Sequence, residues 1–126
     1  MAKSREAYVD TSALIAFCDR SDSYHDLFVR LFDAPPSLVT TPLVIAEGHG
    51  WFLRRFDSTR ALQFLALTAE MRPLKVLPVG PKELAAAHIL LRKFSDQQLT
   101  VADAGGLHVM QSRQIGDCWS TDFHLR

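Results

Sequence analysis

Four acidic residues stand at points where a folded chain could bring carboxylates together: Asp10, Glu47, Asp103 and Asp122. No set of His or Cys residues at metal-ligand spacing accompanies them, so the oxygen ligands favour Mg²⁺ or Mn²⁺ over Zn²⁺. Grouped carboxylates repel one another and are unfavourable without a divalent ion. With the ion, such a site ionises a metal-bound water and places it in line with a phosphodiester. This is the chemistry of metal-dependent nucleases.

Three of these acids also have a structural explanation that involves no ligand. Asp10 follows a β-prone run and could cap the helix after it. Asp103 comes three residues after Thr100, the capping-box pattern in which the acid satisfies backbone donors. Glu47 follows an apolar helical run, where a carboxylate is costly unless it is paired or bound to a cation, although the face could be solvated. The fold has to decide between these alternatives.

The densest basic patch of the chain consists of Arg54, Arg55 and Arg60. Arg54 comes seven residues after Glu47, almost two helical turns, and therefore falls on the same stripe of a helix. This patch could neutralise phosphates, and Arg54 and Arg55 are the residues we assign to that contact. Arginines near a helix end are also ordinary, so the patch alone does not predict a site.

Short β-prone runs alternate with longer helical segments, which predicts an α/β fold with a short, mostly parallel central sheet flanked by helices. The predicted strands cover 7–9, 37–40, 74–77 and 117–121. The predicted helices cover 11–19, a stretch from Asp22 to Pro35, 41–56, 57–71, 81–92 and a stretch from Thr100 onward, with Thr11 and Thr41 as capping residues. The order is βααβααβααβ. Parallel sheets bind ligands beyond the carboxyl ends of their strands, which is where Asp10 and Asp122 fall, whereas Asp117 should start the last strand at the opposite edge.

Length and composition limit what this chain is. A length of 126 residues predicts a single domain over 1–126, and a formal net charge of +0 provides no global attraction to nucleic acid or membrane. The longest uncharged run, 34–46, is far shorter than the roughly 20 residues of a membrane span. Because no signal peptide is visible either, we expect a cytoplasmic protein. Cys18 and Cys118 match no disulfide or metal pattern, so we expect both to be reduced and buried.

Four stretches together resemble one known family, the PIN domain, and within it the VapC-type toxin ribonucleases of prokaryotic toxin–antitoxin pairs. They occur in the family's order and at comparable spacings over nearly the whole chain: Tyr8-Val9-Asp10-Thr11-Ser12-Ala13-Leu14, Thr41-Pro42-Leu43-Val44-Ile45-Ala46-Glu47, Leu99-Thr100-Val101-Ala102-Asp103-Ala104 and Ser120-Thr121-Asp122. Each motif is weak alone, but four in register are fairly specific.

The resemblance implies an endoribonuclease that depends on Mg²⁺ or Mn²⁺ and cleaves RNA phosphodiesters with a metal-activated water. Its catalytic and metal-binding acids would be Asp10, Glu47, Asp103 and Asp122, and Thr11 or Ser12 would assist through a hydroxyl. Asp96 occupies a position where many members also carry an acid. The resemblance further implies a homodimer and a small antitoxin whose tail lies over the acidic cleft.

Glycines follow two of the acids and leave an alternative open. Gly48 and Gly50 come after Glu47, and Gly105 and Gly106 come after Asp103. Glycine inside a helix costs about 1 kcal/mol relative to Ala, so we expect these helices to be loosened and something to approach the Gly105–Gly106 turn closely. A loosened site favours the alternative of a catalytically weak or inactive PIN-like module that binds RNA or protein. A nuclease acting on DNA flaps is a third hypothesis, but 126 residues leave no room for the helices that such proteins add.

Overall fold

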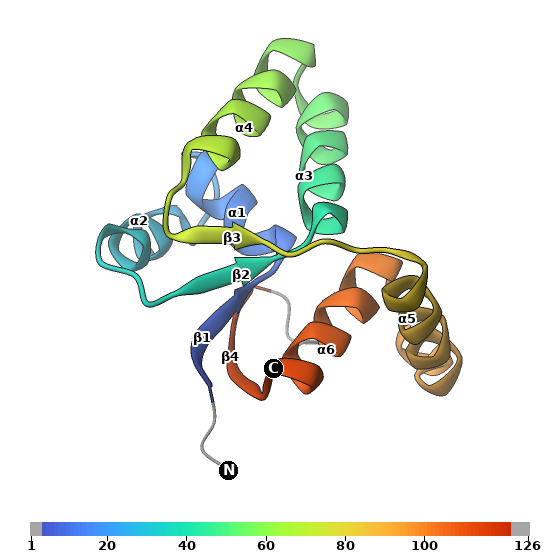
Figure 1. Cartoon of the computed structure of the whole chain (residues 1–126). Coiled ribbons are helices and arrows are strands. Elements are labelled where there is room, and N and C mark those ends of the chain that lie inside the picture. Colours follow the sequence, from blue (N-terminus) through green and yellow to red (C-terminus); the bar gives the residue numbers. More distant parts are fainter. Residues whose placement is uncertain (1–3, 122–126) are drawn as a thin grey trace.

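Four parallel strands form the centre of the fold in a computed structural model, which describes residues 4–121 (Figure 1). The strands lie in the order β3-β2-β1-β4. Each neighbouring pair is parallel, so their carboxyl ends share one edge of the sheet. Their bounds are β1 Ser4–Val9, β2 Leu38–Thr40, β3 Leu74–Val76 and β4 Ile115–Trp119.

Two helices connect each strand to the next, as the sequence predicts, and a short 3₁₀ turn, η1, lies between the last two. The helices are α1 Thr11–Cys18, α2 His25–Asp33, α3 Pro42–Arg55, α4 Ser58–Glu70, α5 Pro81–Lys93 and α6 Val101–Arg113, and η1 covers Ser95–Gln97. Helices α3 and α4 pack against each other, as do α5 and α6, and Figure 1 shows the two pairs on different sides of the sheet. The predicted α/β class and element order are confirmed.

The core lies around the two central strands. Ala7, Tyr8 and Val9 of β1 and Leu38 and Val39 of β2 are almost completely buried. Such continuous apolar runs are typical of parallel strands that are covered on both faces. A buried hydrogen bond from the Thr40 hydroxyl to the Val9 carbonyl (2.8 Å) ties the carboxyl ends of β1 and β2 together. The central strands therefore provide a fixed base for the residues that follow them.

Several predicted boundaries are wrong at the strand ends. The last strand covers Ile115–Trp119 rather than 117–121, because Gln114 ends α6 in the left-handed conformation (φ 57°) and the strand begins at once. Asp117 consequently lies in the middle of β4, exposed, and not at its start. The first strand begins at Ser4, three residues before the prediction. The polar residues Ser4–Glu6 are extended as well, although the apolar run that predicted the strand begins only at Ala7.

Of the two predicted threonine caps, Thr11 is wrong and Thr41 is confirmed in position but not in its hydrogen bond. Asp10, not Thr11, is the N-cap of α1, since its side chain accepts a hydrogen bond from the Ser12 amide. Thr41 is the N-cap of α3 and Pro42 follows it as predicted, but its hydroxyl makes no capping bond. That hydroxyl and the Tyr8 hydroxyl are buried without a hydrogen-bond partner among residues 4–121.

The glycines do not loosen their helices, because α3 and α6 run through them without interruption. They allow close packing instead. A Cβ atom on Gly48 would lie 2.3 Å from Cζ of Phe64, and one on Gly106 would lie 2.6 Å from Cε1 of Tyr8. The predicted close approach at the Gly105–Gly106 turn is therefore confirmed, and the partner is the ring of Tyr8 on β1.

Two composition-based expectations can be compared with the described part of the chain. No helix of residues 4–121 is long and apolar enough to cross a membrane. Cys18 and Cys118 are both free thiols, as predicted, but they are only half-buried. Burial raises the pKa of the Cys18 thiol to about 12, since desolvation disfavours the thiolate.

Candidate active site

Three of the four predicted acids line one cleft at the carboxyl edge of the sheet. Asp10, Glu47 and Asp103 belong to different elements and surround a hollow of about 330 Å³. The remaining lining side chains come from the same elements and from the loop before α6: Thr11, Ser12, Ile15, Trp51, Arg54 and Thr100. The topology thus collects residues that lie up to 93 positions apart in the sequence.

Asp10 is the buried member of the group, with an exposed fraction of 4%. Its Oδ2 accepts hydrogen bonds from the Ser12 hydroxyl (2.9 Å) and the Ser120 hydroxyl (3.2 Å). The Ser12 oxygen in turn accepts from the Thr121 amide (2.9 Å). This network joins the end of β1 to the end of β4. It holds Asp10 at the floor of the cleft and fixes the chain immediately before Asp122.

Glu47 is half-buried in the second turn of α3. Its Oε1 accepts a hydrogen bond from the Thr11 hydroxyl at 2.6 Å. This bond joins α1 to α3 and orients Glu47 beside the residue that follows Asp10. The Glu47 side chain lines the cleft, with the Thr11 hydroxyl as its hydrogen-bond partner.

Asp103 has both of the roles between which the sequence could not decide. It forms a reciprocal capping box, in which the Thr100 amide donates to Oδ2 (2.9 Å) and the Asp103 amide donates to the Thr100 hydroxyl (3.1 Å). It also lines the cleft together with Asp10 and Glu47. Oδ2 serves the cap, so the carboxylate can present its other oxygen to a ligand.

The acids of the cleft form no ion pair with another described residue, although Arg54 lines the same cleft. Burial raises the pKa of the Asp10 carboxyl, the Ser12 hydrogen bond opposes this shift, and the negative charge of Asp103 adds to it. Among residues 4–121, neither Asp10, Glu47 nor Asp103 forms an ion pair. Uncompensated carboxylates in a partly buried cleft are suited to a hard divalent cation.

The described residues nevertheless contain no group of three His, Cys, Asp or Glu side chains close enough together to hold a metal ion. The cap on Asp103 and the Thr11 bond to Glu47 occupy an oxygen of each carboxylate. Asp122, the fourth predicted acid, lies outside the described residues. Asp96, at the position where many family members carry an acid, is exposed in η1 and is not part of the cleft lining.

Comparison with known proteins decides the family. The model of the PIN domain matches residues 7–116. The chain is 32% identical over 108 residues to the ribonuclease VapC26 of Mycobacterium tuberculosis, covering 79% of this chain and 73% of VapC26. This chain belongs to the PIN domain family. Within it, these relationships place the chain among the VapC-type ribonucleases.

A solved structure supports the same fold. The crystal structure of VapC20 of Mycobacterium tuberculosis, a toxin that cleaves the sarcin–ricin loop, matches with a TM-score of 0.85. The identity is 23%, and the match covers 94% of this chain and 92% of VapC20. The PIN fold of this chain, with its parallel sheet and paired helices, is therefore shared with a VapC structure over nearly its full length.

The three arginines of the predicted basic patch divide into two groups in this PIN domain. Arg54 lines the acidic cleft and is exposed, as its position two turns after Glu47 predicts. Arg55 and Arg60 lie instead over the ring of Phe56, with guanidinium carbons 5.9 Å and 4.3 Å from its centre. Of the two arginines predicted to contact phosphate, Arg54 is part of the cleft lining and Arg55 is not.

Sequence reasoning missed Trp51, which also lines the cleft of this PIN domain. The signal was available, since Trp51 comes four residues after Glu47 and three before Arg54, and such residues share a helix face. An aromatic residue in an apolar helical run is usually part of a core, so the sequence alone does not predict that Trp51 lines a cleft.

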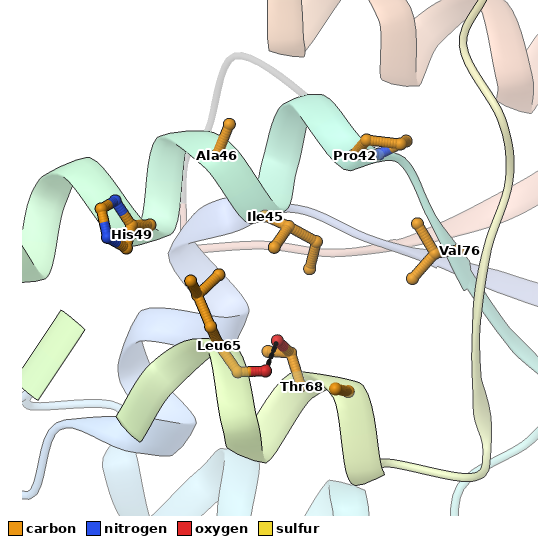
Figure 2. A pocket seen from close by; sticks show the side chains of 8 residues that line it. Pro42, Ile45, Ala46, His49, Leu65, Thr68 and Val76 are labelled. Carbon is orange, nitrogen blue, oxygen red and sulfur yellow. Dashed lines mark hydrogen bonds between the residues drawn. The ribbon is translucent and has the colours of Figure 1, made fainter. Parts of the chain in front are cut away.

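A larger hollow of about 590 Å³ lies between α3 and α4 beside β3 (Figure 2). Its lining is mostly apolar, and in Figure 2 the side chains of Ile45, Leu65 and Val76 point into it, with His49 at one end. Thr68 makes a hydrogen bond back to the Leu65 carbonyl (3.1 Å) within its own helix. No carboxylate belongs to this lining as far as the structure describes the chain, so the candidate site with acidic groups is the smaller cleft.

Proposed function

We propose that this chain is an endoribonuclease that depends on Mg²⁺ or Mn²⁺ and hydrolyses RNA phosphodiesters in the acidic cleft. The observation that carries the proposal is the convergence of Asp10, Glu47 and Asp103 on one hollow, without an ion pair in the described chain. The similarity of this chain to the ribonuclease VapC26 supports the choice of RNA as substrate.

The metal would be held by Asp10, Glu47 and Asp103, and Asp122 is our further candidate ligand from the sequence. These carboxylates have the hard oxygen donors that Mg²⁺ and Mn²⁺ prefer, which is why we judge that they fit the ion. A bound divalent ion supplies a nucleophilic water at neutral pH and neutralises charge that develops on the phosphate.

The protein side chains do the positioning. Ser12 and Ser120 hold the Asp10 carboxylate, and the Thr11 hydroxyl holds Glu47. Arg54 at the wall of the cleft provides a cation for a phosphate of the substrate. Because these contacts exist before RNA arrives, the carboxylates are oriented in advance.

We further propose that the protein is the toxin of a type II toxin–antitoxin pair, acts in the cytoplasm and forms a homodimer. Its family membership supports this assignment, as does the description of VapC20 as a toxin. A small antitoxin would inhibit the enzyme by laying its tail over the acidic cleft. A basic residue in that tail would complement the uncompensated carboxylates.

One observation favours a second candidate, a PIN-like module that binds RNA or protein without cutting it. No group of three ligating side chains is close enough in the described residues to hold an ion, and the Asp103 carboxylate already caps its own helix. A module of this kind would bind RNA equally well with and without metal and would leave it intact.

The test is cleavage of a structured RNA, including a sarcin–ricin loop hairpin, by the purified protein in Mn²⁺, Mg²⁺ or chelator. We expect cleavage with either metal and none with chelator. Asp10→Asn should reduce the rate by at least about 100-fold, as is typical when a catalytic electrostatic group is lost. Asp96→Asn is the matched control, since Asp96 is an exposed acid outside the cleft, and it should retain the rate. Cleavage that persists in Asp10→Asn or in chelator would contradict the proposal.

A further inference from the structure

One face of α3 presents three chemically different side chains to the acidic cleft. Glu47, Trp51 and Arg54 all line it. With a rise of about 1.5 Å per residue, Trp51 lies about 6 Å and Arg54 about 10 Å along the helix axis from Glu47. A single nucleotide is long enough to span the distance from one of these side chains to the next along the helix. The face therefore offers, in order, a carboxylate, an indole ring and a guanidinium.

Trp51 packs against the edge of the hydrophobic core and is only partly buried. Its ring meets the ring of Phe52 edge-on, with centroids 4.9 Å apart and an interplanar angle of 83°. Phe56 supports it in a similar way at 6.1 Å. Phe52 itself is only 1% exposed, whereas Trp51 remains half-buried at the wall of the cleft. The backing rings fix the indole while part of its surface faces solvent.

The indole nitrogen of Trp51 has no hydrogen-bond partner among residues 4–121. Within the part of the chain that the structure describes, the indole N–H donates no hydrogen bond, and Arg54 forms no ion pair. Aromatic side chains bind unpaired bases by stacking, and arginine binds the phosphates that follow. An indole packed against two rings, on the same helix face as a guanidinium, has the chemistry of a nucleotide site, which neighbouring carboxylates alone do not have.

We propose that Trp51 is the base platform of this enzyme: it stacks the base next to the phosphate held in the acidic cleft, and Arg54 contacts the following phosphate. The inference rests on the proposed ribonuclease function and assigns a base-contacting residue to it. A base must leave its helix to stack on a side chain, so the substrate is RNA with unpaired nucleotides at the cut, in a loop or a single strand. Stacking tolerates every base, so Trp51 selects for unpaired structure and not for sequence.

Fluorescence of Trp51 provides a direct measurement of binding. In a Trp119→Phe, Asp103→Asn background, Trp51 is the remaining tryptophan and one cleft carboxylate is neutralised to suppress cleavage. Titration with a short single-stranded RNA should quench the fluorescence with saturation. A blunt RNA duplex of the same sequence should bind at least about 5-fold more weakly.

Two substitutions separate stacking from packing. Trp51→Phe keeps an aromatic face and should bind the RNA, measured by fluorescence anisotropy of a labelled strand, within about 3-fold of the parent. Trp51→Leu keeps an apolar side chain against Phe52 but removes the ring, and affinity should fall by about 5- to 150-fold, the range for loss of one base–aromatic stack. Thermal denaturation of each variant checks that both remain folded at the assay temperature.

Several results would overturn the inference. They are unchanged affinity in a folded Trp51→Leu variant, the absence of saturable quenching, or equal affinity for duplex and single strand. Failure of the ribonuclease proposal is distinguishable from these results. Saturable quenching by RNA that the parent protein never cleaves would retain the Trp51 platform and refute the enzyme. Metal-dependent cleavage that is unaffected in Trp51→Leu would retain the enzyme and refute the platform.

Discussion

Two adjacent glycines on α6 provide a sharp test of how the fold positions the cleft. A Cβ atom on Gly106 would lie 2.6 Å from Cε1 and 2.8 Å from Oη of Tyr8, a ring that is 1% exposed. A Cβ atom on Gly105 would lie 3.2 Å from Cδ1 of Leu43, the end of a flexible side chain. Gly106→Ala should therefore overpack the core, whereas Gly105→Ala should need only a small adjustment of Leu43.

The magnitude follows from comparing the two alanine variants. Replacing Gly by Ala inside a helix stabilises it by about 1 kcal/mol, and this gain is common to both and cancels. Carbon atoms pack best at about 3.5–4.0 Å, so the Gly106→Ala contact is short by about 1 Å. Overpacking of a core typically costs about 1–3 kcal/mol. We expect Gly106→Ala to be less stable than Gly105→Ala by about 1–3 kcal/mol. Each kcal/mol should lower the melting temperature by roughly 3–6 °C.

Urea denaturation and thermal melting of the two variants measure this difference. Gly106 lies three residues after Asp103, and Tyr8 lies two residues before Asp10, so the strain should also move the two carboxylates relative to each other. RNA cleavage by folded Gly106→Ala should fall below that of Gly105→Ala. In a double-mutant cycle, Tyr8→Leu should make Gly106→Ala less harmful, since the crowded ring is gone. Equal stability of the two alanine variants would refute the packing argument.

Three further predictions concern single groups. Burial raises the pKa of Asp10 in the folded chain, so the stability linked to its protonation is present at low pH and is lost as pH rises through the folded pKa. Metal-free Asp10→Asn should therefore be more stable than wild type at neutral pH. The difference in melting temperature between the two proteins should close on acidification. The Cys18 thiol, with a pKa of about 12, should react with a maleimide at pH 8 far more slowly in folded than in urea-unfolded Cys118→Ser protein, and equal rates would contradict its burial. Glu6 accepts two hydrogen bonds from Arg113, so Glu6→Gln should cost about 0.5–1 kcal/mol in urea denaturation, an effect that high salt should diminish.

The fold was largely predictable because apolar periodicity and proline positions decided it. Pro42 and Pro81 mark helix starts in the structure as they do in the sequence. The strand ends were less predictable, because they depend on backbone conformation. Gln114 adopts a left-handed conformation without being glycine, and this moved the start of β4 by two residues.

The site was predictable in its residues and not in its contacts. The acids Asp10, Glu47 and Asp103 do converge on one cleft. That Thr11 bonds Glu47 across 36 positions depends on the packing of α1 against α3, and no local pattern encodes it. The glycines were misjudged for the same reason, since their effect depends on the ring of Tyr8 or Phe64 that packs against them and not on helix propensity.

In the proposed enzyme, the carboxylates of the cleft bind a divalent ion. Titration of the protein with Mn²⁺, with free Mn²⁺ followed by electron paramagnetic resonance, tests it most directly. We predict saturable binding to wild type, at least about 10-fold weaker binding to Asp10→Asn and to Glu47→Gln, and unchanged binding to the surface control Asp96→Asn. Absence of saturable Mn²⁺ binding to folded wild-type protein, or equal binding to all four proteins, would contradict the account.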